Sequence, residues 1–198
     1  AVLMHLLFTE RFLLTDEAWG KAIKAGWFPF MFLSSQRWER LLNAIEYTEN
    51  LHEVEDDIHN AFLKDIDSRL KTWGRIPHFG AHIPFLRDAV EAYKNGKWAM
   101  CVSSAVPRIE GMLRQAFRSW DKMRNVLEQL KQKATTHQHS RSLLFPDRLR
   151  SYFEQVLYRH TPLDEHQHPP TRHTIAHGLA NYEDLDRKLA LTTLLLID

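Results

Sequence analysis

The segment of this chain with the clearest potential for chemistry is 172–178, which reads Arg-His-Thr-Ile-Ala-His-Gly. It places Arg172 five positions before His177, with a second imidazole at His173. Histidine gives and takes protons near neutral pH. The guanidinium of arginine offers a planar set of donors that matches a phosphate and stabilises negative charge developing on it. These residue types indicate acid–base chemistry at a phosphodiester, although the spacing alone is not specific.

RNA suits these groups because it carries its own nucleophile, the 2′-OH beside the scissile phosphate. Cleavage by this route needs a proton acceptor, a proton donor for the leaving 5′-oxygen, and a cation near the phosphorane-like transition state. The motif supplies histidine and arginine for these roles without a metal ion. The predicted products are a 2′,3′-cyclic phosphate and a 5′-OH, and DNA should not be cut.

A carboxylate is expected to orient or compensate these cations, and Glu110 is the candidate. It lies at the edge of the apolar stripe of a long helix predicted over about 97–120. The sequence leaves a second interpretation open, in which Glu110 makes an ordinary pair with Arg114 at i, i+4 spacing on that helix.

Histidines between positions 160 and 177 allow a second kind of site, because histidine is the commonest metal ligand. They are His160, His166, His168, His173 and His177. No cysteine accompanies them, and the helical HExxH pattern is missing. We therefore expect no metal and no other cofactor at the site, with a zinc or nickel centre as the lesser alternative.

Composition indicates an ordinary globular chain, with 44% hydrophobic and 26% charged residues among 198. A single cysteine, Cys101, excludes an internal disulfide and indicates a buried structural thiol in a reducing, cytoplasmic compartment. No apolar run approaches the ~20 residues of a membrane span, so no membrane partner is expected. The chain lacks an initiator Met and stops within an apolar run, which predicts either a trimmed chain or part of a longer protein. The net charge is +1, but 108–160 carries 11 Lys/Arg against 5 Asp/Glu. This basic segment is interpreted either as a surface that follows a phosphate backbone or as a solvated helix face.

Helical periodicity dominates and alternating strands are absent, so the fold class is all-α. Thr15 is expected to cap a short helix, and a longer helix is predicted over 51–73. The acidic run 53–57 is expected to be an exposed helix face. The aromatic run 26–32 interrupts the helices and is interpreted as a loop docked into the core, or as a partner surface.

Near the C-terminus, Thr171 is expected to cap a short helix over 172–177 that ends at Gly178. The N-terminal end of this helix should present free N–H groups to an anion. A final helix is predicted to begin near Glu183. We place a domain boundary in the Gly/Pro-containing stretch after residue 73, with a helical N-terminal extension of unknown role over 1–77 and a helical domain over 78–198.

These features resemble the HEPN (higher eukaryotes and prokaryotes nucleotide-binding) superfamily. Arg172, His173 and His177 fit its pattern of Arg, a polar residue, three residues and His. Three further features are similar to those of uncharacterised bacterial members of the superfamily. They are Gly178, the apolar C-terminal helix that includes 189–198, and the upstream stretch 109–114. The resemblance covers roughly 80–198. It implies a HEPN-like helical bundle that forms a homodimer, with two motifs facing each other across a shared cleft.

The resemblance also implies an activity: family members are commonly metal-independent endoribonucleases in toxin–antitoxin, abortive-infection and CRISPR-linked antiviral defence. Arg172 and His177 would then be the catalytic pair, with His173 as polar supporter and Glu110 and Arg114 as supporting residues. The expected partners are RNA, a second copy of the chain, and an antitoxin or effector protein. The alternative is a catalytically silent module of the same fold that binds RNA or a nucleotide, or acts as a scaffold within a larger effector.

Overall fold

The computed structural model describes residues 15–47, 50–120, 122–136, 146–159 and 169–198. This part of the chain is helical and contains no strand, which confirms the all-α prediction. The α-helices are α2 (Asp16–Lys24), α3 (Ser35–Tyr47), α4 (Leu51–Trp73), α5 (Ile83–Lys94), α6 (Trp98–Phe117), α7 (Met123–Thr136), α8 (Pro146–Tyr152), α9 (Arg172–Ala176) and α10 (Arg187–Ile197). The shorter helical turns are η1 (Pro77–His82), η3 (Phe153–Leu157) and η4 (Tyr182–Asp184). Within the described ranges, no helix combines the length and apolar character that crossing a membrane requires.

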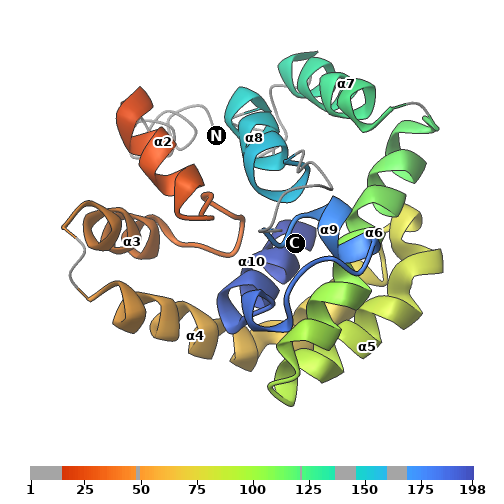
Figure 1. The fold of residues 1–198 in the computed structure, drawn as a ribbon. Coiled ribbons are helices and arrows are strands. Elements are labelled where there is room, and N and C mark those ends of the chain that lie inside the picture. The colour runs from red at the N-terminus through yellow and green to blue at the C-terminus, as the bar shows by residue number, and fades with distance from the viewer. Residues whose placement is uncertain (1–14, 48–49, 121, 137–145, 160–168) are drawn as a thin grey trace.

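Helix α10 lies in the middle of the fold, and the other helices are arranged around it (Figure 1). Its composition explains this position, because a helix that is apolar on nearly every side is stable only when it is surrounded by other elements. The side chains that it buries are Ala190, Leu191, Thr192, Thr193, Leu194, Leu195 and Ile197. Helix α6 packs against α10, and α9 packs in turn against α6, so α9 is attached to the helix that borders the centre of the fold.

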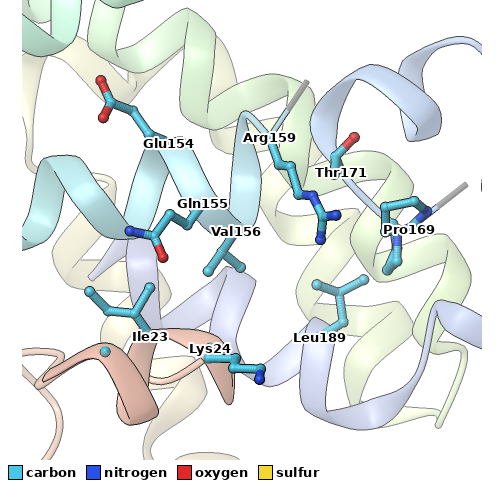
Figure 2. Close-up of a pocket in the computed structure, with 12 residues that line it drawn as sticks. Ile23, Lys24, Glu154, Gln155, Val156, Arg159, Pro169, Thr171 and Leu189 are labelled. Carbon is cyan, nitrogen blue, oxygen red and sulfur yellow. The ribbon is translucent and has the colours of Figure 1, made fainter. Parts of the chain in front are cut away.

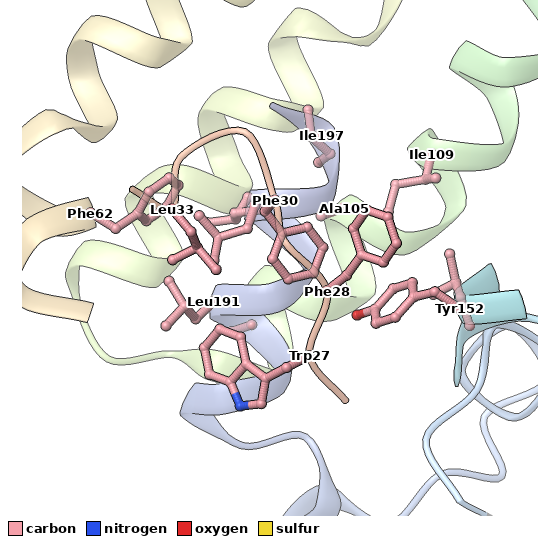
Figure 3. Packing of buried hydrophobic residues seen from close by; sticks show 14 of the residues in the cluster. Trp27, Phe28, Phe30, Leu33, Phe62, Ala105, Ile109, Tyr152, Leu191 and Ile197 are labelled. Carbon is pink, nitrogen blue, oxygen red and sulfur yellow. The ribbon is translucent and has the colours of Figure 1, made fainter. Parts of the chain in front are cut away.

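The aromatic run after α2 packs into the core as a loop, as the sequence predicts. Trp27, Phe28 and Phe30 are buried, and the rings of Phe28 and Phe30 lie 5.7 and 5.6 Å from the ring of Tyr152. Figure 3 shows these rings beside residues of α6 and α10. Buried residues from before and after residue 77 belong to one continuous cluster. The proposed domain boundary at 77 stays a prediction.

Several helix ends follow the signals in the sequence, and one does not. The Thr15 side chain accepts a hydrogen bond from the Ala18 N–H and begins α2, and α4 spans the predicted 51–73. The last helix begins later than predicted, because Asp186 rather than a residue near Glu183 caps it by accepting from the Leu189 N–H at 2.8 Å. Glu183 instead lies in the separate turn η4.

The acidic run at the start of α4 is not the simple exposed face that the sequence suggests. Asp56 pairs with Arg187, and Glu55 pairs with Lys188 at 2.9 Å and accepts a hydrogen bond from the Trp27 indole at 3.0 Å. The run therefore links α4 to the beginning of α10 and to the aromatic loop. Such contacts between distant segments leave no trace in local periodicity.

Helix α6 carries Glu110 and is held closely against η1 at Gly111. A Cβ atom on Gly111 would lie 2.5 Å from Cε1 of His82, too close for any real contact. His82 is 7% exposed, and burial lowers the pKa of its imidazole with help from the nearby charge of Arg108. Cys101, on the same helix, is fully buried, and burial raises its thiol pKa to about 12, as expected for a structural cysteine.

The close approach at Gly111 predicts that Gly111→Ala destabilises the protein by about 1–3 kcal/mol, because the ring of His82 must shift or α6 must move away. Gly80→Ala is the matched control, since a Cβ at Gly80 meets no atom within 4 Å. Its effect should stay within about 0.5 kcal/mol. Urea unfolding monitored by circular dichroism measures both. Equal stability of the two variants would show that the packing at Gly111 is looser than described.

Candidate functional site

The short helix α9 begins at the residue that the sequence predicts as its cap. The Thr171 hydroxyl accepts a hydrogen bond from the Thr174 N–H at 3.3 Å, and the Thr171 N–H donates to the Thr174 hydroxyl at 2.9 Å. The Thr174 hydroxyl also donates to the carbonyl of Pro169 at 2.6 Å. Both threonines are buried. A helix of five residues has little stability by itself. This reciprocal cap therefore fixes the start of α9 at Arg172.

The same cap occupies one of the N–H groups that the sequence predicts to be free at this end of α9. The Thr174 N–H, at the third helical position, is already bound by the side chain of Thr171. An anion would find this donor occupied. The expectation that the other N–H groups of this turn meet an anion stays a prediction, and Arg172 adds a charged side chain to the same turn.

Arg172 points to α6 and pairs with Glu110. The Arg172 Nε lies 2.7 Å from Glu110 Oε2, and the other carboxylate oxygen accepts from Arg114 Nε at 2.9 Å. The Glu110 side chain is only 14% exposed, against 36% for Arg172. Both contacts of Glu110 that the sequence left open, the one with Arg114 and the one with an arginine of the motif, are therefore present. One carboxylate serves the i, i+4 pair on α6 and also holds the arginine of α9.

The two histidines of the motif meet at the other side of α9. The ring centroids of His173 and His177 are 4.5 Å apart with their planes tilted by 59°. His173 is half-buried, whereas His177 follows the last residue of the helix and is exposed. The fold thus gathers Arg172, Glu110 and Arg114 into one charged cluster, and it presents the two imidazoles as a pair of tilted rings in contact, with His177 open to solvent.

Tyr158 is a further group at the charged cluster, and sequence patterns gave no reason to choose it. It follows η3, in a run that reads as ordinary apolar helix. Its hydroxyl is buried and makes no hydrogen bond within the described residues. Burial raises the pKa of this phenol, the negative charge of Glu110 raises it further, and Arg172 and Arg114 oppose the shift. Tyr158 therefore stays protonated and keeps a neutral polar group beside the cluster.

A metal centre finds no support in the part of the chain that the structure describes. No group of three or more His, Cys, Asp or Glu side chains is arranged there to hold an ion. His160, His166 and His168 lie outside the described residues, so the alternative of a metal site that includes them stays a prediction. Two other histidines, His78 and His82, are four positions apart in the sequence, but His78 is exposed whereas His82 is buried against α6.

Comparison with known proteins adds no relative to this picture. The chain matches no protein-family model, no curated protein and no solved structure. The function must therefore be argued from the residues and their geometry.

The central position of Glu110 predicts that Glu110→Ala destabilises the protein by about 1–3 kcal/mol, because two arginines are left around an empty space. Glu110→Gln should cost less, since it keeps the shape and the acceptor oxygen. Asp67→Ala removes a pair between Lys94 and Asp67 at 3.0 Å in which the Asp67 side chain is 65% exposed, and should cost less than about 1 kcal/mol. Urea unfolding at pH 7 ranks the three. If Glu110→Ala costs no more than Asp67→Ala, the carboxylate does not hold α9 in place.

Proposed function

We propose that this chain is a metal-independent endoribonuclease that acts as a homodimer, with Arg172 and His177 as its catalytic pair. The observation that carries the proposal is the 2.7 Å contact between Arg172 and Glu110. It orients an arginine against a largely buried carboxylate, and the same short helix carries His173 and ends just before His177, whose ring centroid lies 4.5 Å from that of His173. The cation and the proton-transfer groups thus lie on, or directly after, one capped helical turn.

The chemistry proposed is transfer of the phosphodiester bond from the 5′-oxygen to the 2′-oxygen. A bond forms between the 2′-oxygen and phosphorus while the bond from phosphorus to the 5′-oxygen breaks. One proton leaves the 2′-OH and one proton reaches the departing 5′-oxygen, so the step needs no oxidant, reductant or water. His177 is the exposed imidazole that can exchange these protons. Arg172 stabilises the negative charge that develops on the phosphate oxygens. The products are a 2′,3′-cyclic phosphate and a 5′-OH.

A second copy of the chain completes the proposed site. One chain provides a single Arg172, and its two imidazoles contact each other rather than facing each other across an open space. A two-fold axis beside α9 would bring a second set of the same residues to one cleft, so that one copy could accept a proton while the other donates one. The activity of such a nuclease must be inhibited until it is needed. We therefore propose an antitoxin or effector protein as a partner, in a system of antiviral defence.

A second candidate function follows from the same contact. Glu110 bridges Arg114 and Arg172, and that bridge is also what a purely structural link between α6 and α9 requires. On this alternative the protein is a catalytically silent module that binds RNA or a nucleotide, or serves as a scaffold. Cleavage chemistry separates the two candidates, because binding of RNA weakened by salt is expected for both.

Replacing the exposed imidazole tests the proposal directly. His177→Ala should lower the rate of RNA cleavage by about 10²–10⁴-fold, the usual contribution of a positioned acid or base. His78→Ala is the matched control, because it removes an exposed histidine far along the chain. The assay uses a labelled structured RNA and its DNA counterpart in excess EDTA, with the cleaved ends analysed for cyclic phosphate.

Three outcomes decide between the candidates. Cleavage of RNA alone that is lost only in His177→Ala supports the endoribonuclease. Cleavage that persists in that variant, free of contaminating nuclease, rejects His177 as catalytic. Binding without cleavage over a broad RNA panel supports the silent module instead.

The geometry of the guanidinium provides a separate test. Arg172→Lys keeps the charge but loses the planar fork that pairs with both Glu110 and a phosphate. We expect cleavage to fall by about 10²-fold. Arg118→Lys is the control for a general loss of arginine, since Arg118 lies beyond the end of α6. Near-normal cleavage by Arg172→Lys would show that Arg172 supplies positive charge only.

A further inference from the structure

A hollow of about 590 Å³ lies between α2, η3, α10 and the segment that precedes α9. Its volume is in the range of pockets that hold small organic molecules. It is distinct from the cluster of Arg172 and Glu110, and none of the residues proposed for RNA cleavage lines it.

The walls of this hollow are mainly apolar side chains that remain partly open. Val156, Pro169 and Leu189 are half-buried, and Ile23 contributes to the floor. Figure 2 shows Val156 and Leu189 on either side of the space. When an apolar ligand covers apolar surface that is exposed inside a concavity, the free energy of the system falls. The hollow therefore favours a ligand with a flat or compact apolar part.

Gly20 widens the hollow on the side of α2. Glycine inside a helix is destabilising relative to alanine, so a glycine in α2 has a cost that packing does not explain. A Cβ atom at Gly20 would meet no atom within 4 Å, and Gly20 lines the hollow. The space next to its backbone is thus open to an incoming molecule.

Two cations, one from α2 and one after η3, give the hollow its charge. Lys24 on α2 and Arg159 after η3 both line it, and neither makes an ion pair or a hydrogen bond within the described residues. Both side chains extend into the region of the hollow near Leu189 (Figure 2). The carboxylate that also lines the hollow, Glu154, is already paired with Arg150 at 2.9 Å and is turned away from Arg159. The hollow therefore has two positive charges available for an anion.

The wall formed by Glu154, Gln155 and Val156 belongs to η3, which is a π-helix. Such turns are rare, and they occur frequently at functional sites because the widened turn re-aims the side chains next to it. Here η3 ends two residues before Arg159, which also lines the hollow.

We propose that this hollow is a binding site for a small organic phosphate, with its phosphate group between Lys24 and Arg159 and its apolar body against Val156 and Leu189. Phosphate is favoured because it carries two negative charges for two cations and matches the guanidinium fork. The apolar walls exclude inorganic phosphate as the best ligand. This proposal does not depend on the activity proposed for Arg172 and His177.

The test uses 1-naphthyl phosphate as the probe and 1-naphthol as its uncharged counterpart, with binding to the full chain measured by titration calorimetry at low salt. The wild type should bind the phosphate at least about tenfold more tightly than the naphthol. Lys24→Ala/Arg159→Ala should weaken binding of the phosphate by about tenfold or more and remove this preference. Gly20→Leu should abolish binding of both probes, because the leucine side chain fills the space. Leucine is a good helix former, so α2 should keep its structure in this variant.

Lys71→Ala/Arg75→Ala is the matched control, since it removes two exposed cations outside the hollow and should leave binding unchanged. Circular dichroism confirms that each variant keeps its helices. The proposal is overturned if the wild type does not bind naphthyl phosphate at millimolar concentration. It is also overturned if naphthol binds as well, or if the Lys24/Arg159 or Gly20 variant binds like the wild type.

Discussion

Burial of α10 on nearly all sides is the constraint on which the rest of this structure depends. A helix that exposes almost no polar face cannot lie at a surface, so α4, α6 and the aromatic loop must enclose it. Electrostatic contacts at its beginning and end fix its position further. Arg187 and Lys188 pair with the acidic start of α4, while Asp198 pairs with Arg69 and accepts a hydrogen bond from the Trp73 indole at 3.1 Å. The termini of the helix are thereby attached to opposite ends of α4.

The site depends on this arrangement because α9 is too short to stand alone. It is joined to α10 by the segment 177–186, and it is attached to α6 through Glu110. The buried pair of Thr171 and Thr174 supplies the local order, and the carboxylate supplies the tertiary contact. Arg172 is therefore positioned by two independent means, whereas His177, beyond the last turn, is held by its backbone N–H, which donates to the His173 carbonyl, and by the contact of its ring with that of His173.

Much of the fold is visible in the sequence, because its signals are local. The cap at Thr15, the bounds of α4 and the cap at Thr171 each arise from residues within a few positions of one another. What the sequence hides depends on partners far along the chain. The acidic run 53–57 reads as a solvated face until α10 is placed beside it. Tyr158 reads as one more apolar position until the cluster around Glu110 is assembled.

The residues just before α9 belong to two structures at once. Pro169 and Thr171 line the hollow, and the same residues make the hydrogen bonds that begin α9. Any molecule that presses against this wall acts on the turn that aims Arg172. If both proposed sites bind their ligands, thermodynamic linkage works in both directions: an occupant of the hollow that favours one geometry of the turn would change the affinity of Arg172 for a phosphate, and that phosphate would change the affinity of the hollow by the same factor. Two sites that share one wall in this way can communicate without any movement of the helical frame around them.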